Sequence, residues 1–551
     1  MSSSDASSGE SKAALDFSTD YEMGQDNIRP LGLDIHNPVF LISSLLIIAF
    51  VLLALANQET AAAFFGGVNP DDVEGCEPGA FCDKGLRSWL TSTFDWFLVL
   101  SVDAITVFCL ALIVLPVGSV RIGGKDAKPD YSYAGWIAMM FAAGIGIGLL
   151  FFGVLEPTYY NFSEGGGASP LGIDASQPGN EYIGVVGTIH HWGLEGWAVY
   201  AVVGLCLAIF CYNLGLPLTL RSAFYPILGE KVWGWWGHAI DTLAVFATLF
   251  GLTTSLGFGA QQVAAGLNEV AGIEPSNTVV VLLIIAITLV ALGSVLLGMD
   301  AGVKRLSEIN MVMAVALFFF VLIMTGPIDA IVRYFGVMTD YVMLLPALSN
   351  PFGREDTSFF HGWTTFYWAW WIAWSPFVGM FIARISKGRT VREFVLCALI
   401  APTCVCALWM STFGGAAIDM MNAGGAEVVK ANVVDSYKPE MALFGFLQEL
   451  PLYSVIAPIS LVLIIIFFVT SSDSGSLVID TITAGGKMDA PVIQRIFWCT
   501  LEGLVAIALL LGGGLSALQG AAVSTGIPFT VVVLIMCYCL WLALRSERAK
   551  F

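Results

Sequence analysis

Long runs of apolar residues limit the folds open to this chain more than any other feature. About twelve runs reach the roughly 20 residues that an α-helix needs to cross a bilayer. Only 12% of the residues are charged, against about a quarter in soluble domains, so water cannot be the main solvent. The sequence therefore predicts an all-α polytopic membrane protein with 12 transmembrane helices. The runs cover residues 38–57, 92–118, 133–156, 183–213, 238–268, 277–298, 306–326, 360–384, 392–414, 453–479, 491–511 and 527–545.

The segments outside these runs are polar or amphipathic. Residues 1–30 are rich in Ser, Asp and Glu, which predicts a disordered cytoplasmic tail, and they lack the charged start and apolar core of a signal peptide. Residues 327–350 mix apolar side chains with Asp329, Arg333 and Asp340, so we expect an amphipathic helix along the membrane surface. Residues 546–551 form a short basic tail, also expected on the cytoplasmic side.

The distribution of Lys and Arg predicts the side of each loop, because cytoplasmic loops of membrane proteins carry the excess of basic residues. With both termini in the cytoplasm, 18 of the 24 basic residues fall on the inner side, and the loop at 157–182 has none. An even number of crossings with both termini inside follows. The outer side keeps Lys84, Arg87, Arg333, Arg354, Lys430 and Lys438.

The eleven cysteines form no metal-binding pattern. Nine of them lie within apolar runs, where free cysteine packs as a small hydrophobic residue. Cys76 and Cys82 share a hydrophilic loop. If that loop lies outside the membrane it allows a disulfide, and two free thiols are the alternative.

Three glycines interrupt the third apolar run at alternate positions, Gly144, Gly146 and Gly148. Glycine destabilises a helix by about 1 kcal/mol relative to alanine, so this run is expected to loosen here. Freed carbonyls in a membrane need partners, and an ion or a closely approaching substrate would supply them. Close packing against another helix is the alternative explanation.

Tryptophan is concentrated in one segment of the eighth run, at Trp368, Trp370, Trp371 and Trp374, just before Pro376. An interfacial aromatic belt is one explanation, but it needs fewer tryptophans. Indole faces attract cations without a charged partner and are suited to quaternary ammonium groups. The segment therefore predicts a binding pocket for a small organic cation or zwitterion.

A second aromatic segment runs from His191 to Tyr200. Trp197 and Tyr200 are three residues apart and share a helical face, whereas Trp192 falls off that face on an ideal helix. Glu195 is a possible functional carboxylate, although we expect it to be solvated near the outer end of the run. His190 and His191 are expected at the membrane interface without a special role.

Hydroxyl side chains gather in two runs, at 470–476 around Asp473 and at Thr248 and 253–255. Hydroxyl and carboxylate oxygens are hard ligands of the kind that alkali cations prefer. Hydrogen bonds from each hydroxyl to the carbonyl four residues earlier are the alternative.

Four segments together closely resemble the betaine/choline/carnitine transporter family. They occur in the family's order and cover nearly the whole chain beyond residue 30. They are AGIGIGLLFFGVLEP from Ala143, HWGLEGWAVY from His191, GMDAGVKRLSEINM from Gly298 and WAWWIAWSPFVGMFIARISKGRTVRE from Trp368.

The resemblance implies a leucine-transporter-type 5+5 inverted repeat with alternating access. Two extra helices with an outer loop would occupy residues 31–132, the first five-helix repeat 133–326 and the second 351–545. Each repeat begins with an interrupted helix, as inverted-repeat transporters do. The family also implies a homotrimer in a bacterial cytoplasmic (inner) membrane, in contact with lipid and with no nucleic acid.

The resemblance further implies roles for individual residues. Trp192, Trp197, Tyr200 and Trp371 match the family's central aromatic box, Trp374 lies next to it on the inward path, and Gly146 and Gly148 lie beside the substrate. A first sodium site matches Ala142, Ile145, Phe467, Thr470 and Ser471, the first three through backbone carbonyls. A second matches Thr248 and Phe377, but Leu252 stands where that site's other hydroxyl is expected.

These expectations combine into a function: import of a small methylated onium zwitterion, glycine betaine or dimethylsulfoniopropionate, by sodium symport, with Na+ as the coupling ion. Gly148 favours a zwitterion, because choline-type members can carry an aspartate there. A proton-coupled choline importer and a sodium-independent carnitine-type exchanger are the alternatives within the family. A receptor without net transport is an alternative from another class, and no nucleophile–base pair or metal cluster in the runs points to an enzyme.

Overall fold

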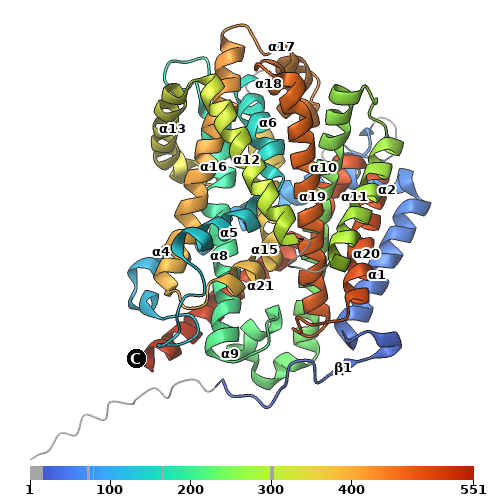
Figure 1. The fold of residues 1–551 in the computed structure, drawn as a ribbon, viewed down its shortest axis with the longest axis vertical. Helices are drawn as coiled ribbons and strands as arrows, with labels where there is room; N and C mark the ends of the chain where they lie inside the picture. Colours follow the sequence, from blue (N-terminus) through green and yellow to red (C-terminus); the bar gives the residue numbers. More distant parts are fainter. Residues whose placement is uncertain (1–16, 71–74, 78–79, 164–166, 298–302, 551) are drawn as a thin grey trace, which may run out of the picture.

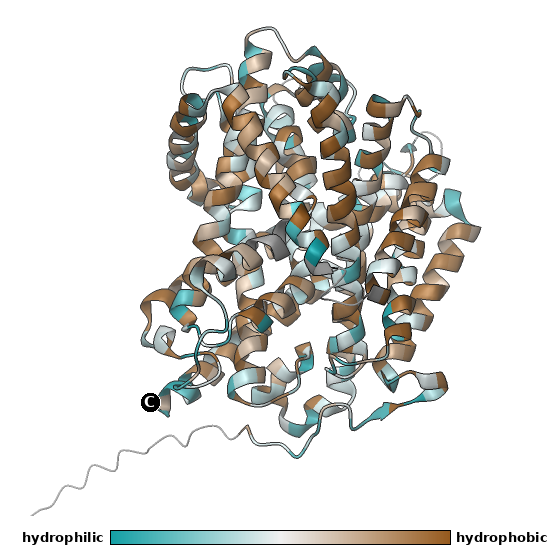
Figure 2. Cartoon of the chain, viewed as in Figure 1, coloured by the Kyte–Doolittle hydropathy of each residue, from teal (hydrophilic) through white to brown (hydrophobic). Residues whose placement is uncertain are grey.

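The computed structural model describes residues 17–70, 75–77, 80–163, 167–297 and 303–550, and almost all of this part is helical (Figure 1). Eleven helical segments among these residues are long and apolar enough to cross a bilayer. The helices on the outside of the bundle consist largely of hydrophobic residues (Figure 2). The prediction of an all-α polytopic membrane protein is confirmed at this level, whereas the count of twelve crossings and the inverted repeat stay predictions.

Ten of the predicted runs form single long helices. Each ends where the sequence supplies a turn residue or a polar loop, as at Gly272, which follows α10 in the left-handed conformation. The helices are α1 (Asn37–Ala56), α4 (Asp95–Val114), α10 (Trp235–Ala271), α11 (Asn277–Leu297), α12 (Val303–Thr325), α15 (Thr365–Ile385), α16 (Val391–Asn422), α19 (Tyr453–Thr483), α20 (Val492–Leu511) and α21 (Gly514–Ala549).

Shorter helices connect these elements on both sides of the bundle. They include α2 (Gln58–Gly66), α3 (Phe81–Thr93), α9 (Tyr225–Leu228), α14 (Thr357–Phe359), α17 (Glu427–Val429) and α18 (Ala442–Gln448). A disulfide joins Cys76, which precedes α3, to Cys82, the second residue of α3. The disulfide that the sequence allowed is therefore present.

Two predicted runs are broken in the middle. The third run splits into α5 (Tyr133–Ile145) and α6 (Gly148–Phe162), because Gly146 adopts φ +42°, a conformation that favours glycine. The fourth run splits into α7 (Ile183–Trp192) and α8 (Leu194–Ala208) at Gly193, whose backbone is not helical. Both breaks lie beside the site described below.

Burial separates the inner helices from the outer ones. In the most apolar window of each segment, 89% of the residues of Ile183–Asn213 and 83% of those of Trp235–Ala271 are buried, against 17% in Arg305–Thr325. Helices α8 and α10 therefore form the core, and α15 packs along both of them. Helix α12 presents most of its surface to the outside of the bundle.

Helix α13 (Pro327–Leu348) is the predicted amphipathic surface helix. It also meets the length and hydropathy criteria for a crossing, with a mean hydropathy of 1.3 that is the lowest of the eleven segments. Its Arg333 is buried, donates to the Ser411 carbonyl at 2.5 Å and pairs with Asp419 of α16. The helix is thus anchored to the bundle by a charged residue, and its position on the membrane surface stays a prediction.

The N-terminal segment is more ordered than the sequence predicts. Strand β1 (Asn27–Ile28) pairs with β2 (Ile35–His36), and Tyr21 stacks on Trp233 with ring centroids 4.2 Å apart. Asp34 forms a salt bridge with Lys487 at 2.9 Å, in the turn between α19 and α20. The predicted disordered tail at 1–30 is therefore wrong for residues 17–30, while residues 1–16 lie outside the described residues.

Candidate functional site

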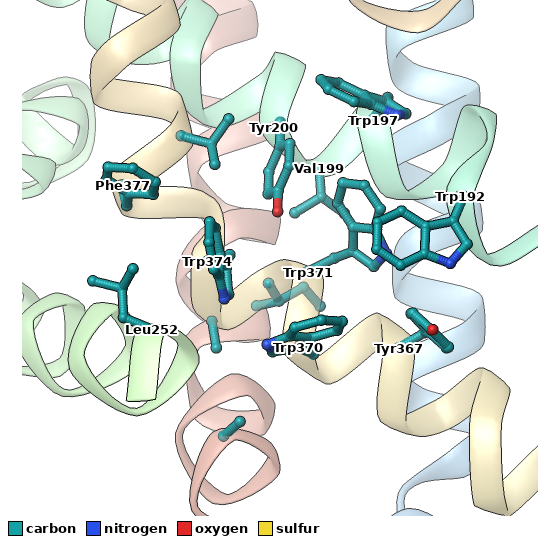
Figure 3. Packing of buried hydrophobic residues seen from close by; sticks show 14 of the residues in the cluster. Trp192, Trp197, Val199, Tyr200, Leu252, Tyr367, Trp370, Trp371, Trp374 and Phe377 are labelled. Atoms are coloured by element: carbon teal, nitrogen blue, oxygen red, sulfur yellow. The ribbon is translucent and has the colours of Figure 1, made fainter. Parts of the chain in front are cut away.

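An aromatic box lies where α8, α15 and the two helix breaks meet. Trp371 of α15 is its centre (Figure 3), and its ring centroid lies 4.6 Å from that of Tyr200, 5.7 Å from Trp192 and 5.8 Å from Trp197. All four side chains are at most 3% exposed. The structure thus brings together the four predicted box residues, including Trp192, which helical spacing alone could not place.

Trp192 joins the box because the chain is not helical at Gly193. The break redirects α8 relative to α7, so the last residue of α7 and a face of α8 converge on Trp371. An unbroken helix would have separated Trp192 from Trp197 and Tyr200. The break is the local feature that completes the box.

A cavity of about 330 Å³ adjoins the box and is lined by eight residues. This volume includes space that is open to the surroundings. Trp370 and Ser255 line it as well, and neither was among the predicted substrate residues. None of the lining residues is charged; they are Ile147, Gly148, Trp192, Tyr200, Ser255, Trp370, Trp371 and Trp374.

Trp374 lies beside the box, as predicted, and is held by a backbone carbonyl. Its indole N–H donates to the Gly251 carbonyl of α10 at 2.8 Å, and the indole of Trp370 donates to the same oxygen at 3.3 Å. One carbonyl of α10 therefore orients two of the tryptophans that line the cavity.

Three glycines allow the indole rings to pack this closely. A Cβ on Gly196 would lie 2.6 Å from the Trp371 ring, and one on Gly251 would lie 2.9 Å from Trp374. A Cβ on Gly148 would overlap the Trp192 ring. These glycines therefore shape the box, a role that sequence reasoning did not assign to Gly196 or Gly251.

A buried carboxylate behind the box was missed by sequence reasoning. Glu156 of α6 is fully buried and accepts hydrogen bonds from the Trp192 indole at 2.8 Å and from the Tyr160 hydroxyl at 2.7 Å. Tyr367 also donates to it, and His191 Nδ1 lies 2.9 Å away. A carboxylate in an apolar run was the signal that could have pointed to it.

Glu195, His190 and His191 are buried rather than solvated or interfacial. Glu195 is 1% exposed, accepts from Tyr341 of α13 at 2.9 Å and lies 3.1 Å from His190. The prediction of a solvated Glu195 is therefore wrong, because α13 covers the end of α8. The two histidines are buried as well, His190 against Trp368 and His191 between Phe359 and Tyr367.

The residues of the predicted first sodium site come from two helices. Ala142 and Ile145 belong to the end of α5, while Phe467, Thr470 and Ser471 belong to α19. A Cβ on Gly146 would lie 3.5 Å from the Ser471 hydroxyl, so the residue that follows α5 lies close to α19. The Thr470 hydroxyl donates to the carbonyls of Ile466 and Phe467, so its lone pairs remain available.

The predicted second sodium site has fewer oxygen ligands in place than the first. The Thr248 hydroxyl is buried with no hydrogen-bond partner among the described residues, and the Phe377 ring packs against Trp374 at 5.4 Å. Leu252 instead fills the space beside Gly475 of α19. Thr253 and Thr254 donate back to the Phe250 carbonyl, as isolated hydroxyls in helices do.

The start of α6 is the main candidate partner for an anionic group, since no charged side chain lines the cavity. Gly148 is the first residue of α6 and lines the cavity, and the helix start has no side-chain cap. The first turn of a helix leaves backbone N–H groups free and carries a partial positive charge. The N-terminal turn of α6 can therefore bind an anionic group such as a carboxylate.

Comparisons with known proteins agree over nearly the whole chain. Residues 38–549 match the model of the BCCT family, described as betaine/carnitine/choline family transporters. The chain is 51% identical to a glycine betaine/proline/choline transporter of Vibrio parahaemolyticus, over 96% of this chain and 94% of the relative. It is 47% identical to a glycine betaine/proline/choline/ectoine transporter of the same organism, over 97% and 91%. A glycine betaine transporter of Bacillus subtilis is 39% identical, over 89% and 93%.

Proposed function

The chain belongs to the betaine/carnitine/choline transporter family, and from this we propose that it imports a small methylated onium zwitterion by sodium symport with alternating access. Glycine betaine is the first candidate substrate and dimethylsulfoniopropionate the second. The observation that carries the proposal is the box around Trp371, four aromatic side chains beside a cavity without a charged lining residue.

The box suits an onium group for a physical reason. A quaternary ammonium or sulfonium cannot donate an N–H hydrogen bond, so it gains little from a carboxylate partner of fixed geometry. Aromatic faces attract its charge through their quadrupoles and its methyl groups through dispersion. Each such contact contributes about 0.5–2 kcal/mol when water is excluded.

The carboxylate of the zwitterion would lie at the start of α6. Gly148 lines the cavity there, and the N-terminal turn of the helix favours negative charge. Gly146, which was also predicted to lie beside the substrate, lines a different cavity. Such an arrangement would allow a zwitterion to bind without an Arg or Lys in the cavity.

Sodium would couple to the substrate through the same helix break. Ala142 and Ile145 end α5 directly before Gly146, so an ion held by their carbonyls and by Thr470 and Ser471 would fix the break from the side opposite the substrate. Two ligands that stabilise one conformation each raise the affinity for the other. We further propose that the protein is a homotrimer in a bacterial cytoplasmic membrane with both termini inside.

The test is uptake of labelled glycine betaine by proteoliposomes that contain the purified protein. With sodium outside, the concentration of glycine betaine inside the vesicles should rise above the concentration outside. Replacing the external sodium by potassium should abolish this accumulation. Thr470→Ala should raise the sodium concentration needed for half-maximal uptake without changing the amount of protein. Accumulation that persists in potassium would refute sodium coupling.

The box is tested separately with Trp371→Ala. Binding should fall by at least about tenfold, since the variant removes the ring that contacts the other three. Trp235→Ala is the matched control, because Trp235 is 72% exposed and distant from the box in sequence and fold. Equal substrate affinities of the two variants would refute the pocket assignment.

A proton-coupled choline importer is the second candidate, because two relatives are described as transporters of choline as well as glycine betaine and proline. Choline-type members of the family can carry an aspartate where this chain has Gly148. A side chain at this position would overlap Trp192, which argues against the choline candidate. A thermal-shift series with glycine betaine, choline, proline and ectoine, with and without sodium, distinguishes the candidates by mass action. Choline stabilisation that is independent of sodium would favour the second candidate.

A further inference from the structure

A second cavity, separate from the aromatic box, lies between α12, α16, α19 and the break between α5 and α6. It has a volume of about 850 Å³, including the part that opens to the outside. The side chains that line it are all apolar apart from the Trp409 indole, and Gly146 lies at one end. It shares no lining residue with the cavity beside the aromatic box.

The cavity opens on the outer surface of the bundle. Its rim includes Val315 and Phe319 of α12 and Val405 of α16, which are 46%, 53% and 40% exposed. Its inner end includes Gly146 and Leu150, which are buried. It is therefore a pocket that runs from the surface of the bundle inward to the helix break.

The rim lies at the depth of the hydrocarbon core. Helix α12 has 23 residues and so measures about 34 Å, with Met311 and Phe319 about 12 and 24 Å from its first residue. The pocket is thus centred near the middle of a helix that matches the roughly 30 Å of the bilayer core. Helix α12 is apolar along most of its length (Figure 2) and is the least buried of the eleven long segments.

Water is a poor occupant of this space. Several water molecules would be needed to fill it, and each requires two to four polar partners. The lining supplies a single indole N–H and otherwise carbon and sulfur side-chain atoms. A void would lose dispersion contacts along the whole wall.

We propose that this pocket binds one acyl chain of a membrane phospholipid, and that the bound chain supports the α5–α6 break from the lipid side. The pocket is continuous with the lipid-facing surface of α12, and its apolar lining matches a hydrocarbon chain. The chain end reaches Gly146 and Phe467, which border the proposed sodium site. The second part of this inference rests on the proposed function, whereas the binding itself does not.

The consequence is a dependence of transport on the lipid chain. Gly146 must change conformation if the break takes part in alternating access, and a flexible acyl chain can adapt to both positions. A rigid side chain in the same space cannot, so it should slow turnover without changing the aromatic box. Ala314 of α12 lines the pocket and is small enough to be replaced by a filling side chain.

The experiment uses the full chain in proteoliposomes that contain a phosphatidylethanolamine with a photoactivatable diazirine in the middle of one acyl chain. After irradiation, peptides around Met311–Phe319 are analysed by mass spectrometry. Labelling of pocket residues should fall at least about fivefold in Ala314→Trp, as expected when a side chain competes for the same space. Val312→Trp is the matched control, because Val312 is on the same helix, 69% exposed and not part of the pocket lining.

Uptake measured on the same samples tests the functional part. Ala314→Trp should lower the maximal rate at least about threefold with little change in KM, and Val312→Trp should change neither. If Ala314→Trp does not fold, Val405→Trp fills the pocket from the α16 side.

Three outcomes would overturn the inference. Labelling that is the same in Ala314→Trp and Val312→Trp would show that no acyl chain enters the pocket. Cross-links between two copies of the chain through these residues would show that a second copy covers it. Labelling that falls while uptake stays normal would refute the functional part. Labelling does not depend on the transported substrate. Normal labelling without uptake of betaine would therefore refute only the proposed function.

Discussion

Replacing Gly196 with alanine should weaken substrate binding by moving a single ring. The new Cβ would lie 2.6, 2.8 and 3.0 Å from three atoms of the Trp371 indole, whereas ordinary contacts are 3.4–4 Å. The ring must therefore shift by about 1 Å, in a box where the ring centroid of Tyr200 is only 4.6 Å from its own. Displacing one ring of the cage costs about 1 kcal/mol of cation–π attraction. That energy corresponds to a rise in KM of roughly fivefold.

The assay is sodium-driven uptake of glycine betaine in proteoliposomes, with KM and maximal rate measured separately. Alanine is favoured over glycine in a helix by about 1 kcal/mol, so the variant is not expected to weaken α8 through its backbone. Overpacking costs about 1–3 kcal/mol, and the net effect on thermal stability should be small.

Gly293→Ala and Gly336→Ala are the controls, because a Cβ at either position has no neighbour within 4 Å. Both should leave KM unchanged. A normal KM in Gly196→Ala, with protein that elutes and melts like the wild type, would refute the reasoning that Gly196 sets the position of Trp371.

Three further predictions follow from other contacts. Glu156→Gln should raise KM several-fold and destabilise the protein by about 1–3 kcal/mol, since one of the groups that converge on the carboxylate then faces an amide NH₂; unchanged uptake and melting temperature would contradict it. Gly148→Asp should abolish betaine binding rather than create choline transport, because its side chain overlaps Trp192; titration calorimetry with both compounds decides. Cys76→Ser with Cys82→Ser should lower the melting temperature slightly and leave KM unchanged, because the disulfide closes a short loop away from the box; a changed KM would show that the loop reaches the site.

The sequence predicts most of the helices because bilayer length and hydropathy are local properties. Its composition also predicts the tryptophan segment around Trp371 as cation-binding, whereas Trp197 and Tyr200 are joined to that segment only through the family resemblance. Trp192 could be added only through the family resemblance, since its position depends on the backbone at Gly193, where the helical period ends. Periodicity arguments fail wherever a helix is broken.

Tertiary contacts explain the features that were missed. Glu195 looks solvated in the sequence, but α13, which begins more than 130 residues later, covers it. Glu156 looks like one acidic residue in an apolar run, and only the fold shows that Trp192, Tyr160 and Tyr367 converge on it. Nothing in the sequence marks Gly196 and Gly251 as important, because the indole rings that pack against them come from a distant helix.

The N-terminal hairpin offers a position from which movement of α19 can be measured. Asn27 donates to the Ala484 carbonyl at 2.9 Å, the backbone N–H of Asp34 donates to Gln494 at 3.1 Å, and Lys487 pairs with Asp34. The hairpin is thus attached to the turn that joins α19 to α20, at the end of the helix that carries Thr470 and Ser471. A fluorophore on the hairpin would travel with that turn, so its distance to a second fluorophore on α16 would report each cycle of the transporter without a label near the cargo.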